Sequence, residues 1–355
     1  MGLRKSQANL NLAEKTAFVD ALLALKQRPS RLHPTAANRS RYDDFVEVHL
    51  NAMNVMMTTP PAPSWGHMAA AFSPWHRVLL MVFERELQSV NPSVTLPYWD
   101  WTVDQSPTGS LWKPDFLGGS GAGPQGRVAD GKFAGASGHW PINIKDDPSA
   151  PNFLRRQIGA AADARNLPTA ARQAQVLTLT PYDVSPWDDM LRDQQNAGQW
   201  GGFRIGLEIP LHNLVHRWVG GNMLDMSSPN DPVFWLHHCN LDRLWAVWQL
   251  AHPAIPGYLP GSGGPTGHNI NDRMIFHAPG DPAPWDGEFR PIDVIDHRTL
   301  GISYDTDPVA GPPIVVPQPG PVDAREAERL QRQPRATLPM FALPEEIPGL
   351  RSKWG

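Results

Sequence analysis

The sequence has one cysteine in 355 residues, so it lacks the thiols for an internal disulfide or a cysteine-rich zinc or iron–sulfur site. It also has no apolar run near the length of about 18 residues that spans a membrane. The 31 basic and 35 acidic residues leave a net charge of −4, without the positive excess that attracts nucleic acid or anionic lipid. We therefore expect neither nucleic acid nor a membrane among the partners of this chain.

The N-terminal segment over residues 1–29 has no sign of a targeting signal. It is charged and amphipathic, with Phe18, Leu22 and Leu25 on one helical face. It lacks the uninterrupted apolar segment of a secretory signal peptide. We expect a cytoplasmic protein, and export assisted by a partner protein is the alternative.

Proline is abundant, with 38 residues, whereas average usage is roughly 5%. Much of it lies in the segment 103–150, which has the Gly, Pro and Ser content of irregular structure, and in the segment after Tyr304. We predict a main domain over residues 1–305 and a proline-rich C-terminal extension over residues 306–355.

Apolar residues recur at helical spacing in two blocks, residues 42–90 and 205–250. The second helix of the first block is expected to begin with Ser73 as its cap, and a short helix is expected around Asn152–Ala164. In all, the blocks predict four helices. One covers Asp43–Met57, and the other three begin at Ser73-Pro74, after Pro210 and at Asn230-Asp231-Pro232.

The chain has 13 histidines, and five of them lie on the apolar stripe or on one face of these four helices: His49, His76, His212, His216 and His238. A single such residue is ordinarily a core imidazole that pairs with a backbone carbonyl. Four helices that each bury an imidazole incur a desolvation cost that metal binding would offset. With His67 added, nine residues before His76, the histidines form two triads: His49, His67 and His76; and His212, His216 and His238.

The two triads contain only imidazole ligands, which favour copper, zinc, iron or nickel over magnesium or calcium. No carboxylate evidently completes either triad, so the set most resembles a dinuclear copper centre. Of the adjacent pair His237-His238, we assign His238 to the metal because it shares the better apolar stripe. His237 would point about 100° away, so it is expected to support the site or the fold.

Longer motifs around these histidines resemble the tyrosinase family. The first copper-binding region of that family resembles Trp65-Gly66-His67, Ser73-Pro74-Trp75-His76-Arg77 and Leu96-Pro97-Tyr98-Trp99-Asp100-Trp101. The second resembles the run from His212 to Gly221 and the run from Ser228 through His238 to Trp245. The likeness covers about residues 42–101 and 205–250 and is greatest to bacterial tyrosinases.

The resemblance implies a mainly α fold, in which an antiparallel four-helix bundle holds a dinuclear type-3 copper site among long irregular loops and few short strands. It places two copper ions on the same six histidines, with dioxygen as co-substrate. It implies ortho-hydroxylation of small monophenols and oxidation of o-diphenols to o-quinones. A copper-delivery partner is compatible with this reading, and the oligomeric state stays open.

Four further residues acquire roles from the resemblance. Glu208 and Asn213 would hold a water that takes the proton of the phenol. Arg217 would steer substrate carboxylates at the pocket mouth, and Met226 would contact the substrate above the coppers. Alternatively, Glu208 is an acidic residue at a helix start that complements the helix dipole. Asn213 would then be a polar residue on the helix surface, and Arg217 a solvated surface arginine.

Two other functions share the predicted ligands. One is a catechol or o-aminophenol oxidase without appreciable monophenolase activity, and the other is an oxygen carrier of the haemocyanin type. The C-terminal extension raises a related question. The sequence favours a tail that lies along the core or is partly disordered, and insertion of Phe341 into the copper pocket is the alternative.

Overall fold

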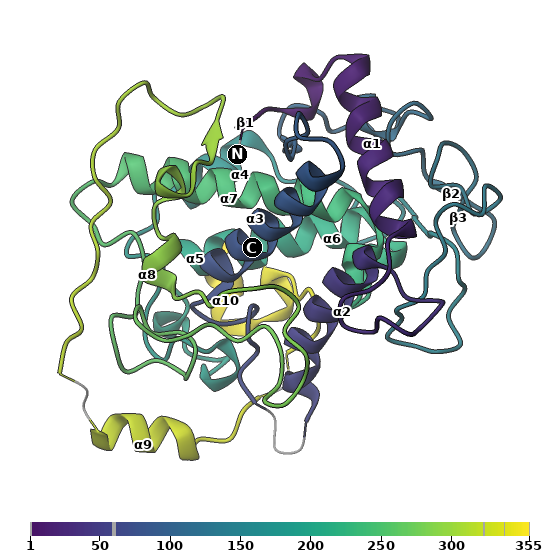
Figure 1. Cartoon of the computed structure of the whole chain (residues 1–355). Coiled ribbons are helices and arrows are strands. Elements are labelled where there is room, and N and C mark those ends of the chain that lie inside the picture. Colours follow the sequence, from purple (N-terminus) through teal and green to yellow (C-terminus); the bar gives the residue numbers. More distant parts are fainter. Residues whose placement is uncertain (1, 59–61, 322–323, 337, 355) are drawn as a thin grey trace.

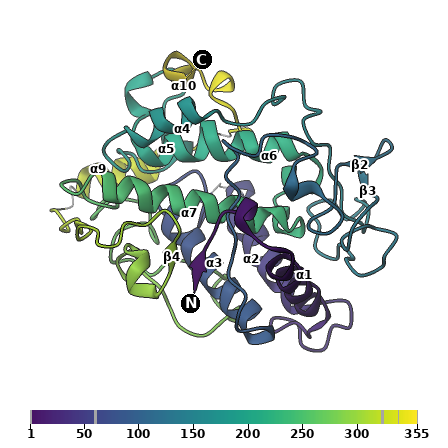
Figure 2. The same cartoon turned by 90° about the horizontal axis from the view of Figure 1, so that it is seen from above.

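The computed structural model describes residues 2–58, 62–321, 324–336 and 338–354. Four helices or helical segments surround the centre of the molecule (Figures 1 and 2): α2 (Arg41–Asn54), α3 (Phe72–Val90), the segment α5–η6–α6 (Phe203–Leu207, Glu208–Asn213, Leu214–Val219) and α7 (Val233–Ala251). The four strands among the described residues are two residues long: β1 (Leu3–Arg4) pairs with β4 (Ser303–Tyr304), and β2 (Gly121–Ala122) pairs with β3 (Arg127–Val128). The predicted mainly α fold with few short strands is confirmed.

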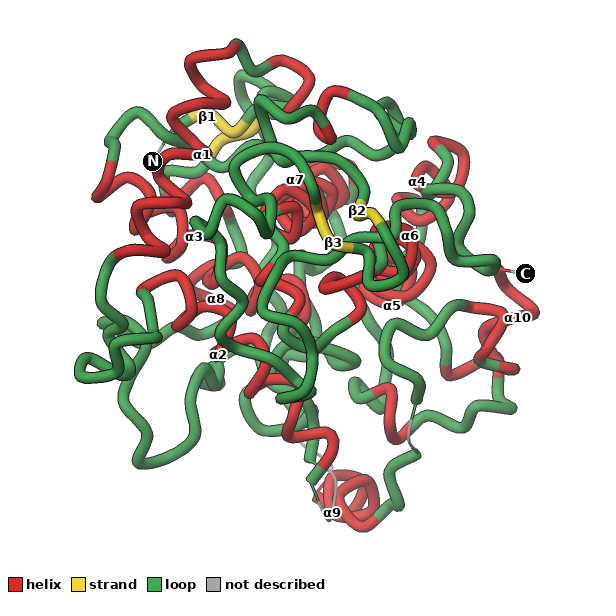
Figure 3. The backbone as a smooth tube through the Cα atoms, turned by 90° about the vertical axis from the view of Figure 1, so that its right-hand side faces the viewer, coloured by secondary structure: helices red, strands yellow, loops and turns green. Residues whose placement is uncertain are grey.

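Outside this centre, irregular chain prevails (Figure 3), as predicted for the segment 103–150. The outer helices are α1 (Leu12–Gln27), α4 (Ala170–Leu177), α8 (Pro291–Val294), α9 (Ala324–Arg332) and α10 (Pro348–Trp354). The apolar face expected near the N-terminus exists, since Phe18, Leu22 and Leu25 of α1 are buried. Among the described residues, no helix is both long and apolar enough to cross a membrane.

Helix α2 begins where its sequence encodes a cap. The Ser40 side chain accepts from the backbone N–H of Asp43, and the Asp43 carboxylate accepts from the N–H of Ser40, a reciprocal capping box. The helix ends at Asn54 and continues as the 3-10 turn η2 (Val55–Met57). The predicted extent of Asp43–Met57 is therefore close to the observed one.

Three local predictions are wrong. Helix α3 begins at Phe72, so Ser73 lies inside its first turn and caps nothing. The helix expected after Pro210 begins earlier, at Phe203, and passes through the proline in the wide π turn η6. Proline lacks an N–H and so cannot complete the regular ladder, which favours the wider turn. The segment 152–164 contains turns and no helix.

Helices α3 and α7 pack against each other at the centre. The rings of Phe83 and Trp235 stack with 3.5 Å between centroids and 7° between planes. Beside them, the buried Arg77 guanidinium donates to Asp242 at 2.6 Å. These contacts fix the relative positions of the two helices that carry His76 and His238.

The C-terminal segment runs along the outside of the molecule to α9 and then returns across the molecule to α10, which lies at its edge in Figures 2 and 3. Its return is held by contacts with the segment 188–200. The N–H of Ala336 donates to the Met190 carbonyl at 2.7 Å, and Arg335 pairs with Asp188 at 3.1 Å. The described part of the tail therefore lies along the core, while the domain division at residue 305 stays a prediction.

Candidate dinuclear metal site

The first predicted triad is assembled from two helices and a loop. His49 comes from α2, His67 from the loop before α3, and His76 from the second turn of α3. All three are buried, with exposed fractions of 0, 2 and 3%. Each offers a ring nitrogen, and these nitrogens lie within 4.8 Å of one another. The structure thus brings the three histidines together as predicted.

The second triad lies on the segment α5–η6–α6 and on α7. His212 belongs to the π turn, His216 to α6 and His238 to α7. The Nε2 atoms of His216 and His238 are 3.5 Å apart. Two bonds of about 2.0 Å to one metal, meeting at a tetrahedral angle, would hold two nitrogens about this far apart. This pair is therefore spaced as ligands of one ion.

Hydrogen bonds made by Nδ1 fix the orientation of four of the six imidazole rings. The Nδ1–H groups of His49, His76 and His216 donate to the carbonyls of Met226, Phe72 and Met223, at 2.7, 2.8 and 2.6 Å. The Nδ1–H of His212 donates to Asn213 Oδ1 at 2.8 Å. A proton held on Nδ1 leaves the lone pair on Nε2 for a metal.

Five of the six triad histidines keep a buried ring nitrogen without a hydrogen bond: the Nε2 atoms of His49, His76 and His212, both nitrogens of His67 and the Nδ1 of His238. The Nε2 of the sixth, His216, approaches only the Nε2 of His238. Burial lowers the pKa of His49 to about 4 and that of His212 to about 3, so both rings are neutral at pH 7. Neutral imidazoles with unpaired buried nitrogens are the donors that a copper, zinc or similar ion requires, so the residues fit the predicted metals.

The two triads are neighbours. The rings of His76 and His238 stack with 4.3 Å between centroids, and those of His67 and His212 are 5.9 Å apart. Rings from different triads are thus as close as rings within one. The arrangement fits one dinuclear site better than two separate ones.

His237 also lies in this group. Its ring nitrogen is within 4.8 Å of those of His212, His216 and His238, and neither of its nitrogens has a hydrogen bond. Its ring stacks on that of His212, with 5.3 Å between centroids and 15° between planes. The helical spacing of about 100° therefore does not by itself remove His237 from the site. The preference for His238 rests on its 3.5 Å approach to His216 and stays a prediction.

A cavity of about 160 Å³ leads to the histidines. His67 and His212 are in its wall, together with Glu208, Asn213 and Met226, three of the four further residues that the sequence singled out. Seven methionines line it in all. Most of the wall is apolar, which suits an aromatic ring.

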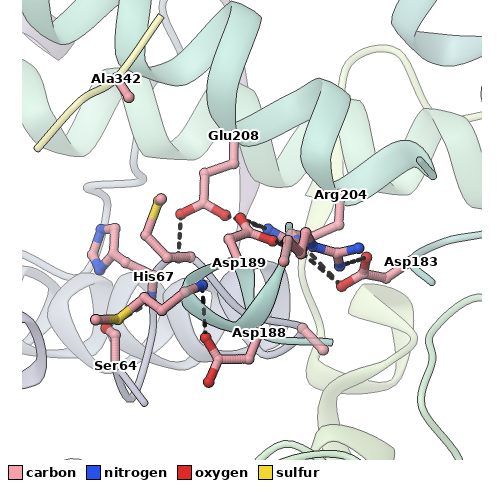
Figure 4. A network of polar contacts seen from close by, with 12 residues as sticks. Ser64, His67, Asp183, Asp188, Asp189, Arg204, Glu208 and Ala342 are labelled. Atoms are coloured by element: carbon pink, nitrogen blue, oxygen red, sulfur yellow. Dashed lines mark hydrogen bonds and ion pairs between the residues drawn. The ribbon is translucent and has the colours of Figure 1, made fainter. Parts of the chain in front are cut away.

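Glu208 is buried and held from two sides (Figure 4). Its Oε1 accepts from the backbone N–H of Met68 at 2.6 Å, and its Oε2 accepts from Arg204 at 3.0 Å. Arg204 is itself bound by Asp183 and Asp189. Burial raises the pKa of Glu208 to about 8, although the Arg204 guanidinium opposes the rise. A carboxyl group poised near neutral pH beside the cavity is suited to accept a proton.

Asn213 makes different contacts from those expected. Its Oδ1 accepts from His212, and its Nδ2 donates to the carbonyl of Ala342 in the tail at 2.7 Å. It therefore orients a triad member and binds the tail in this structure, while the water shared with Glu208 stays a prediction.

Arg217 lies outside the cavity wall. Its guanidinium pairs with Glu346 of the tail at 2.6 Å and with Asp163. Its predicted role in steering carboxylates is untested, but its present partners are carboxylates of the chain itself.

Phe341 packs against the second triad. Its ring is 4% exposed and stacks on His216, with 4.2 Å between centroids. The residues 338–341 form one wall of the cavity. The sequence favoured a tail that lies along the core or is partly disordered, with insertion of Phe341 as the alternative. In the structure the described tail lies along the core and also places Phe341 in the cavity wall, against the second triad. No spacing rule finds this contact, because 125 residues separate Phe341 from His216.

Comparison with known sequences agrees with the site. The family profile described as "Common central domain of tyrosinase" matches residues 39–251. A tyrosinase of Streptomyces glaucescens is 45% identical, across 86% of this chain and 100% of the relative. A tyrosinase of Streptomyces antibioticus is 46% identical, across 84% of this chain and 97% of the relative. Grixazone synthase of Streptomyces griseus is 34% identical, across 85% and 99%.

Solved structures share the fold. A polyphenol oxidase of Thermothelomyces thermophila matches with a TM-score of 0.61 at 22% identity, across 85% of this chain and 87% of the other. A deoxygenated haemocyanin of Rapana thomasiana matches with a TM-score of 0.51, also at 22% identity, across 93% and 74%. The fold is therefore shared with a polyphenol oxidase and a haemocyanin, and the relatives in sequence identify the family. The chain belongs to the tyrosinase family of copper-dependent polyphenol oxidases.

Proposed function

We propose that this chain binds two copper ions in the triads and uses dioxygen to convert monophenols and o-diphenols to o-quinones. The observation that carries the proposal is the pair of adjacent triads beside an apolar cavity, in which five of the six histidines keep a buried ring nitrogen without a hydrogen bond. The tyrosinases among its relatives support phenols as the substrate class.

When bound, the copper pair would supply the redox chemistry with dioxygen. A monophenol and one dioxygen give one o-quinone and one water. Two o-diphenols and one dioxygen give two o-quinones and two waters. The monophenol reaction alone inserts oxygen into the ring, and it begins with removal of the phenolic proton.

The protein would contribute the proton acceptor and the shape of the cavity. Among the described residues of the cavity wall, Glu208 is the ionisable side chain other than histidine, and its carboxylate form, which increases as the pH rises towards its pKa of about 8, can accept a proton. Met226 lines the cavity and accepts from His49 through its carbonyl, so it links substrate contact to ligand position. The apolar wall would exclude bulk water and orient the ring.

Two alternatives use the same ligands. An oxidase restricted to catechols or o-aminophenols would lack the first proton transfer, and the 34% identity to a grixazone synthase keeps a second oxidase function in view. An oxygen carrier of the haemocyanin type would keep its pocket closed, and here Phe341 covers the second triad. The identity of 45–46% with tyrosinases favours the enzyme.

The test uses copper-loaded full-length protein, a monophenol and its matching catechol. Copper content, oxygen uptake and quinone formation are measured on one sample, with His216→Ala as the control that removes a ligand. We expect about two copper ions per chain and quinone from both substrates. Quinone from the catechol alone would indicate the restricted oxidase. Reversible oxygenation without quinone, in the full chain and in a chain that ends at Pro321, would overturn the enzyme.

A further inference from the structure

Methionine is concentrated in the wall of the cavity. The chain has 11 methionines, and seven of the fourteen residues that line the cavity are methionine. No lysine or arginine is in that wall as far as the structure describes it. Thioether sulfur is a soft, uncharged donor that prefers Cu(I) to harder divalent ions. A wall of thioethers above a copper site therefore has a chemical property that an ordinary apolar wall lacks.

Three of these methionines lie at the end of α2 and in the turn η2 that continues it, beyond His49 of the first triad. Met53 and Met56 follow His49 by four and seven residues, so they share its face of the helix. Met57 is 66% exposed, Met56 is half-buried and Met53 is 3% exposed, while His49 is fully buried. The exposed fraction of these side chains thus decreases steadily from Met57 in η2 to His49 in α2.

A second group of methionines belongs to the same cavity wall. Met68 directly follows His67, and its backbone is held by Glu208 in the left-handed region at φ 54°, which is strained for a residue with a side chain. Met226 accepts the Nδ1–H of His49 through its carbonyl, and its side chain lines the same cavity. Met340 joins from the tail and is 42% exposed. Several methionines are therefore fixed directly beside metal-binding histidines.

We infer that these methionines form a thioether site that captures Cu(I) in the cavity wall and passes it to the histidine triads. The inference rests on the proposed copper centre. Transfer is an exchange of ligands, in which Cu–S bonds break as Cu–N bonds form and copper stays Cu(I). The direction follows from the donors, because every histidine of the first triad keeps a buried Nε2 without a hydrogen bond, and this nitrogen gains a partner on binding.

The first experiment measures how fast copper enters the full-length apoprotein. Cu(I) is supplied anaerobically as its complex with a chromophoric chelator, and loss of that complex is followed with time. The test variant is Met53→Leu/Met56→Leu, and the control is Met81→Leu/Met274→Leu, two buried methionines outside the cavity. Leucine conserves volume, so both variants are expected to fold.

We expect the cavity variant to load Cu(I) about tenfold more slowly than the parent and the control variant to match the parent. Loading with Cu(II), which prefers nitrogen and oxygen donors, should be equal in all three proteins. Equal Cu(I) rates in all proteins would overturn the inference. So would slowing of Cu(I) and Cu(II) alike, which would mark a packing defect and leave the thioethers as a wall for the substrate ring.

The second experiment separates this inference from the copper centre itself. X-ray absorption is recorded on apoprotein frozen early and late after addition of Cu(I) below one equivalent. We expect sulfur neighbours at the early time and nitrogen neighbours at the late time. Nitrogen neighbours alone from the start would overturn the thioether site and leave the copper centre intact. Sulfur neighbours that persist would support capture by methionine and contradict transfer to the triads.

Discussion

The ring of Phe341 lies parallel to the imidazole of His216, with 4.2 Å between centroids and 12° between planes. The same ring is 5.9 Å from His212, so it covers two members of the second triad. Next to it, the Ala342 carbonyl takes the Nδ2–H of Asn213 at 2.7 Å. The tail thus places an aromatic ring against the second triad and a hydrogen bond beside it.

Removal of this ring should raise activity. Phe341 has φ 52°, a conformation that glycine adopts without strain, so Phe341→Gly removes the ring while the backbone keeps its path. Burial of a phenylalanine ring contributes about 1.5–3 kcal/mol, so we expect kcat/KM for a phenol to rise about tenfold or more. Steady-state kinetics check this, with Arg332→Ala on the exposed helix α9 as the control. Unchanged kcat/KM in Phe341→Gly and in a chain that ends at Pro321 would exclude a covering role.

Arg217 should also favour the tail position that covers the second triad, but with a smaller effect than Phe341. Its ion pair with Glu346 joins a partly exposed guanidinium to a tail carboxylate, and such a pair is worth at most about 1 kcal/mol. Arg217→Ala is therefore expected to raise kcat/KM by about fivefold or less, equally for neutral and carboxylated phenols. Kinetics with both substrate types distinguish this from steering. A loss confined to the carboxylated phenol would instead support the predicted contact with substrate.

The histidines show how much of the site the sequence predicts. His49 and His76 lie on regular helices, where a spacing of 3.6 residues per turn determines which side chains face the core. His212 and His216 are separated by four residues and still meet, although a π turn contains the first of them. Helical periodicity survives such a local change because the turn widens without reversing the face.

Contacts that depend on distant chain segments are not encoded in any local pattern. The partners of Arg217 and the position of Phe341 depend on how the tail returns across the molecule, and loops impose little periodicity on their residues. Glu208 was found through the resemblance, but its clamp by Arg204 required the segment that carries Asp183 and Asp189 to fold beneath it. Such contacts follow from packing, so only the structure supplies them.

Glu208→Gln should harm monophenol turnover selectively. Both carboxylate oxygens accept from donors, Met68 N–H and Arg204, so a glutamine must turn its NH₂ towards one of them. We expect a loss of stability of about 2 kcal/mol and a fall in monophenol kcat at least about tenfold larger than the fall in catechol kcat. The control is Asp189→Asn, which also disturbs Arg204 but is not in the cavity wall. Equal losses for both substrates would contradict a role in proton transfer.

The pH profile gives an independent check on Glu208. Its pKa of about 8 is above the ordinary value of 4.5, so the proton-accepting carboxylate increases as pH rises towards that value. Parent monophenol turnover should therefore rise with pH over this range, and Glu208→Gln should lose the rise. Bound copper favours the carboxylate and shifts the midpoint to lower pH. A parent profile identical to that of the variant would contradict the assignment.

The unpaired imidazoles should measurably lower the free energy of unfolding of the metal-free protein. His67 has no hydrogen bond on either ring nitrogen, whereas the Nδ1 of buried His268 accepts the N–H of Ala71 at 3.0 Å. We expect His67→Leu to stabilise the apoprotein by about 1–3 kcal/mol and His268→Leu to destabilise it, because the second change orphans a buried N–H. Urea unfolding of the two variants and the parent measures both effects. Equal destabilisation by the two changes would show that the His67 nitrogens are not costly.

The stabilisation by His67→Leu should grow in acid. Burial lowers the pKa of His67 well below 6.5, so the unfolded chain gains a proton below that pH and the folded chain does not. The unfolded state then binds more protons, and the parent loses stability as pH falls, by up to about 1.4 kcal/mol per pH unit for each such imidazole. His67→Leu removes one of them, so its advantage over the parent should be larger at about pH 5 than at about pH 7. Copper should reverse the order at neutral pH, because only the parent keeps a complete first triad to bind it.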